Sequence, residues 1–207
     1  RPVKIYRVAS VVFVVGLIGG FTLTNTAKAE NVSLDSLPSA LNIVNKVNSV
    51  DDGEFVTRNL TMTLIDKRGK SRVRETKAYR KYYNGEKRTI LFYKKPTNVK
   101  GTSFLTFDYQ DASKDDDQWL YLPALRKVRR ISSSDRGDYF LGTDFTYEDI
   151  KLEGKLELED YNFEVKNTEK LTLDNGSVHN TYLLNGTPKT PGIAKELGYG
   201  FTEFWVD

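Results

Sequence analysis

Residues 115–135 read DDDQWLYLPALRKVRRISSSD, and the interpretation of the rest of the chain starts from this stretch. Its acidic beginning leads into an apolar run at residues 118–122, and a basic run follows at residues 126–131. Both runs have the length and side-chain content of strands, and Pro123-Ala124 between them marks a tight connection. The stretch therefore predicts a β-hairpin that joins an acidic run to a basic one.

The same alternating pattern extends in both directions from this hairpin. Leu60, Met62 and Leu64 alternate with polar residues, which is typical of a half-buried antiparallel strand. Asn84-Gly85 is a hairpin turn signal between two longer runs. Further strands are predicted at residues 71–83, 88–94, 101–109, 140–150, 162–173, 178–185 and 200–206. The chain is therefore predicted to be a meander of antiparallel strands.

An amphipathic helix is predicted ahead of the meander, because apolar residues recur there at spacings of three and four. These residues are Leu34, Leu37, Leu41, Val44 and Val47. Pro38 fits only near the first turn, with Asp35 or Ser36 as a possible cap. A short helical turn is also predicted at residues 191–197. The long helix has one apolar stripe, so another element must cover it.

Several predicted strands are apolar in both phases, notably around residues 104–109 and 119–122. A sheet with water on one side does not need that pattern. Either both faces of the sheet are covered, or one face lines a cavity for an apolar ligand. The pattern alone leaves the two possibilities equal.

Residues 1–29 have the layout of a secretory signal peptide. A basic start is followed by an apolar run at residues 8–23, and Ala27-Lys28-Ala29 forms a small-x-small cleavage triplet before Glu30. The alternative is an uncleaved inner-membrane anchor. The run is shorter than the roughly 20 residues that span a bilayer and it contains three glycines, which favours cleavage between Ala29 and Glu30.

Charge and composition narrow the function classes. Residues 1–29 hold four of the 31 basic residues and none of the 28 acidic ones, so residues 30–207 carry a net charge of −1. The basic pI is then no evidence for nucleic-acid binding. The chain has no cysteine, which excludes disulfides, thiolate metal sites and a lipid-modified cysteine. We expect one domain at residues 30–207, truncated at its C-terminal end.

Two clusters could carry chemistry, and each has a plainer interpretation. His179, the only histidine, could be combined with Asp135 and a serine at 132–134, but no Gly-x-Ser-x-Gly elbow is present, which favours a surface histidine. Aspartates 108, 111 and 115–117 could bind calcium, but their spacing matches no EF-hand loop. A solvated acidic loop is favoured there, and no cofactor or metal site is expected.

The basic run offers a third possibility. Arg126, Arg129 and Arg130 could contact phosphate head groups or an acidic partner at a cavity mouth. They could equally pair with the aspartates across the hairpin.

Residues 115–135, followed by Gly142-Thr-Asp-Phe-Thr-Tyr-Glu-Asp149, resemble the outer-membrane lipoprotein-sorting proteins of the LolA-like superfamily. The resemblance is to the branch associated with exporters of the resistance-nodulation-division (RND) type, and Thr187-Pro188-Lys189 and residues 204–207 resemble its later strands. It implies a curved antiparallel sheet, an incomplete β-barrel whose concave face is covered by helices. It also implies a cavity for acyl chains, and further strands after residue 207. No residue here matches the arginine that holds the lid of the lipoprotein carrier closed.

Together, the pattern and the resemblance predict a periplasmic carrier of lipoproteins or other acyl lipids, without covalent chemistry. The alternative is a protein-interaction module that serves or senses an RND-type exporter. The residues expected to line the lipid cavity are Leu60, Met62, Leu64, Ile90, Phe92, Phe104 and Trp119. Because a shift of one residue inverts the face of a strand, this set depends on the phase chosen for each strand. On this set, Met62→Asp is expected to abolish lipid retention in a folded protein.

Overall fold

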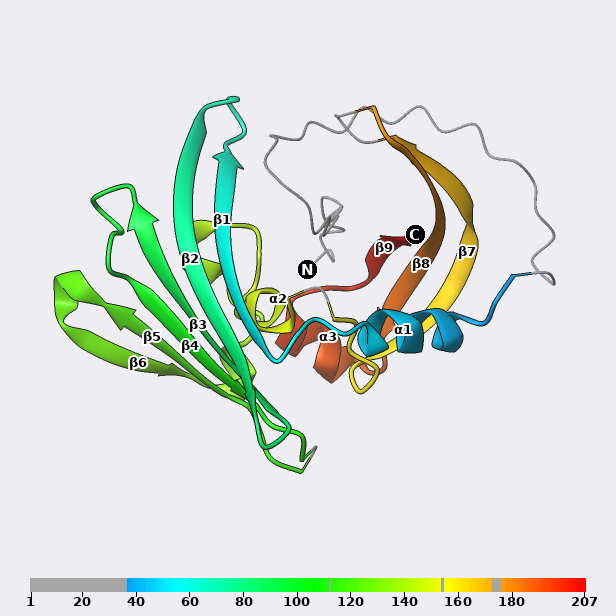
Figure 1. The fold of residues 1–207 in the computed structure, drawn as a ribbon, viewed down its shortest axis with the longest axis horizontal. Coiled ribbons are helices and arrows are strands. Elements are labelled where there is room, and N and C mark those ends of the chain that lie inside the picture. Colours follow the sequence, from blue (N-terminus) through cyan, green and yellow to red (C-terminus); the bar gives the residue numbers. More distant parts are fainter. Residues whose placement is uncertain (1–36, 112, 154, 173–175) are drawn as a thin grey trace. The chain divides into compact units, whose positions relative to one another are not determined.

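The computed structural model describes residues 37–207, apart from 112, 154 and 173–175 (Figure 1). The signal peptide and its cleavage site therefore lie outside the described residues. The chain divides into two compact units. One is Asp51–Lys151, and the other combines the chain up to Val50 with Leu152–Asp207. Among the described residues, no helix is long and apolar enough to cross a membrane.

The Asp51–Lys151 unit is built on a six-stranded sheet with strands in sequence order, every neighbouring pair antiparallel. Its strands are β1 (Phe55–Ile65), β2 (Ser71–Tyr83), β3 (Glu86–Lys95), β4 (Ser103–Asp108), β5 (Asp117–Leu122) and β6 (Lys127–Ile131). Asn84 and Gly85 both have positive φ, 51° and 84°, and form the predicted tight turn between β2 and β3. The predicted meander and the central hairpin are confirmed.

One face of this sheet is covered by the segment that follows β6. Its core contains Met62, Leu91, Phe104 and Leu120 from the strands, with Phe140 and Tyr147 from the covering segment. Phe140 is fully buried, and its ring centroid lies 5.1 Å from that of Phe104 and 5.4 Å from that of Tyr147. The covering segment is therefore fixed to the sheet by packed aromatic rings.

The strand predicted at residues 140–150 is wrong. Residues Phe140–Gly142 form a tight turn in which Leu141 has φ 50°, and α2 (Tyr147–Leu152) is a short helix. The Asp149 carboxylate accepts a hydrogen bond from the Thr146 N–H at 2.7 Å, and the Thr146 hydroxyl accepts one from the Asp149 N–H at 3.1 Å. This reciprocal pair has the geometry of a capping box, which starts a helix where alternation suggested a strand.

The second unit contains a three-stranded antiparallel sheet of β7 (Tyr161–Thr172), β8 (Val178–Pro188) and β9 (Thr202–Val206). α1 (Ala40–Ser49) places Ile43 and Val44 against Leu156 and Leu184 in a separate core. α3 (Pro191–Leu197) has the bounds that the sequence predicts. Each unit therefore has its own apolar core.

The start of α1 differs from the sequence prediction. Ser39, which follows Pro38, is the N-cap, and its hydroxyl accepts a hydrogen bond from the Asn42 N–H at 3.3 Å. The predicted caps, Asp35 and Ser36, lie before the described residues. Pro38 thus precedes the cap, where its fixed φ and missing N–H disturb no helical hydrogen bond.

The predicted fold class is confirmed: the described part of the chain is mainly antiparallel β with three α-helices, and neither sheet closes on itself. In each unit, one face of the sheet carries a helix, α2 in one and α1 in the other.

Candidate functional site

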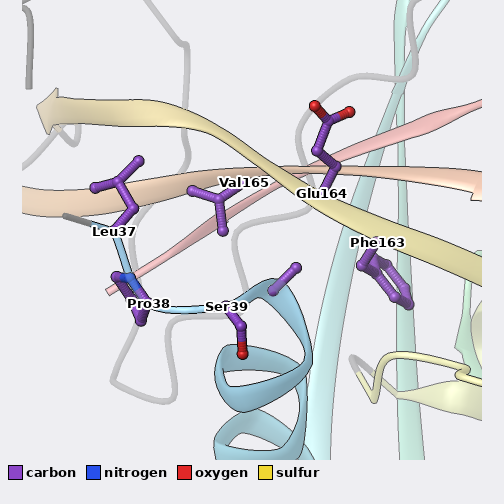
Figure 2. A pocket seen from close by; sticks show the side chains of 7 residues that line it. Leu37, Pro38, Ser39, Phe163, Glu164 and Val165 are labelled. Carbon is purple, nitrogen blue, oxygen red and sulfur yellow. The ribbon is translucent and has the colours of Figure 1, made fainter. Parts of the chain in front are cut away.

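A groove in the second unit lies between the start of α1 and the first half of β7 (Figure 2). Its volume is 360 Å³, within the range of small-molecule sites. The lining residues are Leu37, Pro38, Ser39, Ala40, Phe163, Glu164 and Val165. Figure 2 shows Phe163 and Val165 pointing toward the helix, whereas Glu164 points away from it. Apolar side chains thus face the helix, while polar atoms contribute about as much of the groove surface as apolar ones.

Local packing explains why β7 presents these side chains. Strand alternation places Phe163 and Val165 on the face that α1 covers, and both pack against the core of this unit. The Phe163 ring also contacts the rings of Tyr161 and Phe204, at centroid distances of 5.9 and 6.1 Å. Gly186 makes room for it, because a Cβ at that position would lie 2.9 Å from Phe163 Cε1. One wall of the groove is thus held by the core.

The seven residues expected to line the lipid cavity belong to the six-stranded sheet, and the structure divides them between its two faces. Directly paired residues of antiparallel strands share a face. The register therefore places Leu60, Met62, Leu64 and Phe104 on the face that α2 covers, and Ile90, Phe92 and Trp119 on the opposite face.

The two groups have different surroundings. Met62 and Phe104 are buried in the core, Leu64 packs against it, and Leu60 is exposed. On the opposite face, Ile90, Phe92 and Trp119 are half-buried. Because Met62 belongs to a packed core, we now expect Met62→Asp to destabilise the fold itself, so this substitution is a poor test of lipid retention.

The predicted head-group arginines occupy the hairpin and its second strand. Arg126 lies in the turn with φ 48°. Arg130 donates from Nε to the Asp117 carboxylate at 3.0 Å, and an Arg129 guanidinium nitrogen lies 3.6 Å from the Asp135 carboxylate. Pairing across the hairpin, one of the two interpretations of the basic run, therefore applies to Arg130.

The acidic loop before β5 is also internally bonded. The hydrogen bonds that the Asp117 carboxylate accepts from Arg130 and from the Tyr109 hydroxyl lower its pKa below the ordinary value. The Ser113 hydroxyl and N–H both donate to Asp111, which lowers the pKa of that carboxyl. Among the described residues, no cluster of acidic or histidine side chains is arranged to hold a metal ion.

Sequence analysis missed a buried ion network on the covered face of the six-stranded sheet. Lys151 lies 2.7 Å from the Glu148 carboxylate and also pairs with Asp116, while Lys87 lies 2.7 Å from Asp108. Lys87 Nζ also donates to the Lys151 carbonyl at 3.2 Å. Burial alone would lower the pKa of Lys151, but the Glu148 and Asp116 carboxylates raise it above the ordinary value. The network therefore holds α2 to the sheet with charged contacts.

His179 has partners that sequence analysis did not consider. Its Nδ1 lies 2.7 Å from Asp207 Oδ2, and its Nε2 lies 3.1 Å from the Ser177 hydroxyl. The two ring nitrogens thus face the residue types of a serine triad. The Asp207 side chain is 64% exposed, however, and in water the interactions that would stabilise a transition state are weak. The serines at 132–134 and Asp135 lie in the other unit.

Comparison with known proteins places the chain in a family. A family model described as "-like: Uncharacterized protein" matches residues 85–207, more than half of the chain. The chain belongs to this family. A search of curated proteins found no match to this chain.

Two solved structures are similar to this family member. One is an outer-membrane lipoprotein-sorting protein domain from Vibrio parahaemolyticus, with a TM-score of 0.64 and 30% identity. The alignment covers 81% of this chain and 66% of that one. The other is a DUF1329 family protein from Desulfovibrio piger, with a TM-score of 0.62 and 28% identity over 80% of this chain and 65% of that one. The chain thus spans just under two thirds of each relative. The predicted likeness to lipoprotein-sorting proteins is confirmed for the fold.

Proposed function

We propose that the protein is a carrier of lipoproteins or other acyl lipids in the bacterial envelope. Its location would be the periplasm, as the pattern of residues 1–29 predicts. An inner-membrane exporter of the RND type is the partner that we propose, on the resemblance of residues 115–135 and 142–149. The reaction would be binding and release without covalent chemistry.

The observation that carries this proposal is the likeness to a solved lipoprotein-sorting domain over 81% of the chain. The groove between α1 and β7 is consistent with it. Leu37, Pro38 and Ala40 form one wall, and Phe163 and Val165 form the other. Each methylene that moves from water against these apolar side chains contributes up to about 0.8 kcal/mol, so part of one acyl chain could bind between the two walls.

The predicted lining residues on the covered face of the six-stranded sheet differ in how much of each side chain is already packed. Met62 and Phe104 are already packed by α2 and the turn before it. Leu60 and Leu64 are the members of the predicted lining set at the margin of that core. We propose these two as acyl contacts within this unit. Arg126 is the first candidate for a head group, because Arg130 pairs with Asp117 and Arg129 lies 3.6 Å from the Asp135 carboxylate.

The experiment is native mass spectrometry with lipid extraction on protein secreted to a bacterial periplasm and purified without detergent. Leu37→Asp puts a charge at the groove and should reduce the bound lipid. The matched control is Leu41→Asp, because Leu41 is 55% exposed on α1 and does not line the groove. Both variants keep Ser39 as the cap, so the helix should form equally in both.

Stoichiometric acyl lipid in the unmodified protein and in Leu41→Asp, with less in Leu37→Asp, supports a carrier that uses this groove. Equal lipid in all three proteins rules out the groove as the site. Unmodified protein without lipid contradicts the carrier function, and cross-linking to an inner-membrane transporter would then identify an interaction module.

A further inference from the structure

The face of the six-stranded sheet opposite α2 carries an extended apolar surface. The register aligns Tyr79, Ile90, Leu105 and Trp119 in one row across four strands. Phe92 and Phe107 flank this row, and their rings contact those of Tyr79 and Trp119 edge to face, at centroid distances of 6.3 and 5.2 Å. None of these six residues belongs to the core under α2. We call this face of the sheet, with these six residues at its centre, the aromatic face.

Large exposed side chains continue the aromatic face to its margins. Half of the large exposed apolar residues described in the chain lie on it, namely Phe55, Ile65, Val73, Tyr83, Tyr121 and Val128. Within the Asp51–Lys151 unit, the segment that packs on the sheet covers the other side. The six central side chains form a continuous apolar patch across β2–β5, and such a patch on an open sheet face marks a docking site for a protein or a membrane.

The charges on this face identify the chemistry of the partner. Each of its three carboxylates has a cation of its own: Glu75 with Lys95, Glu86 with Arg88, and Asp117 with Arg130. Three further cations, Lys77, Lys81 and Lys94, form no ion pair among the described residues. Lys77 Nζ lies 5.2 Å from the centre of the Tyr79 ring, and Lys94 Nζ lies 5.5 Å from that of Phe92. The face is therefore apolar with a net positive charge.

The three unpaired lysines favour a membrane over a protein as the partner. Protein–protein interfaces are depleted in lysine, whereas anionic membrane surfaces attract lysine and arginine. Tyrosine and tryptophan beside lysines that keep their ammonium groups in water are the side chains found at membrane–water boundaries. We propose that the aromatic face docks on a membrane surface that contains anionic phospholipid. This inference does not depend on the α1–β7 groove or on what it binds.

The test is co-sedimentation of the full chain with phosphatidylcholine vesicles, with and without phosphatidylglycerol, at low and high salt. The triple variant Lys77→Gln, Lys81→Gln, Lys94→Gln should lose about fivefold in affinity for each lysine, roughly 100-fold in all. The control variant is Lys170→Gln, Lys189→Gln, Lys195→Gln, which removes three exposed lysines from the other unit and should keep its affinity.

A second readout places the contact on the sheet. In a Trp205→Phe background, Trp119 is the only tryptophan, and its emission should shift to the blue on anionic vesicles. All variants are prepared with the same N-terminus, so that any contribution of residues 1–29 to vesicle binding is equal among them. The Leu37→Asp variant should bind vesicles normally, so failure of the carrier proposal and failure of this one are distinguishable.

Binding that is selective for phosphatidylglycerol, weakened by salt, lost in the triple variant and reported by Trp119 supports membrane docking. Equal binding by the two triple variants, or an unchanged Trp119 emission on bound protein, overturns it. Absence of vesicle binding also overturns it. In that case, self-association that buries Trp119, or its cross-linking to an acidic protein, would assign the face to a protein partner.

Discussion

Phe140→Ala tests whether the segment after β6 holds the six-stranded unit together. The Phe140 ring is fully buried and contacts three aromatic rings, those of Phe104, Tyr147 and Tyr93, at centroid distances of 5.1, 5.4 and 6.3 Å. Truncating a buried phenylalanine costs about 3–5 kcal/mol, and the three ring contacts favour the upper part of this range. The free energy of unfolding of a domain is typically about 5–15 kcal/mol, which leaves little margin for such a loss.

The assay is equilibrium urea unfolding followed by Trp119 fluorescence in a Trp205→Phe background, so that the signal reports on this unit. With a urea dependence of about 2 kcal/mol per molar, the midpoint should fall by about 2 M. The control is Tyr139→Ala, because the neighbouring Tyr139 is 57% exposed and should cost less than about 0.5 kcal/mol. Similar midpoints for the two variants would refute the packing argument.

Two further predictions concern a close contact and a titration. Gly186→Ala should destabilise the second unit by about 1–3 kcal/mol, because the new Cβ would lie 2.9 Å from the Phe163 ring. The control is Gly192→Ala, whose Cβ would meet nothing closer than 3.6 Å and should not destabilise this unit. Thermal unfolding of the two variants is compared with that of the unmodified protein. Because Arg130 lowers the pKa of Asp117, the pair stabilises the folded state above the ordinary aspartate pKa of about 4, and this contribution is lost as the pH falls through the lowered value. Arg130→Gln should raise the pKa of Asp117 in a carboxyl NMR titration, and an unchanged value would contradict the pairing.

Local sequence signals predicted much of the fold. The bounds of β2 and α3 match the predicted residues, because a turn signal or a proline stands at an end of each. Residues 140–150 were mistaken for a strand, although Thr146 and Asp149 have the spacing of a capping box, which was the available signal for a helix.

The candidate site was less predictable, because it depends on which face each strand presents. In β4, Phe104 and Leu105 are adjacent and both apolar, so the sequence does not indicate which one faces the core. The ion network is also invisible from local patterns. Lys87 reaches the carbonyl of Lys151 across 64 positions of the chain, and neither residue stands out in its own segment.

The long sequence separation between α1 and the residues that it packs against has a consequence for the order of folding. The Asn48 side chain bonds the backbone of Leu156, a residue 108 positions later, and Val44 packs against the same stretch. During vectorial synthesis, α1 therefore emerges long before β7 and β8 exist to bury its apolar stripe. Closing a loop of this size is entropically slow compared with forming the β2–β3 hairpin. The six-stranded unit can thus mature first, and in the interval the nascent helix is a ready target for a holding chaperone.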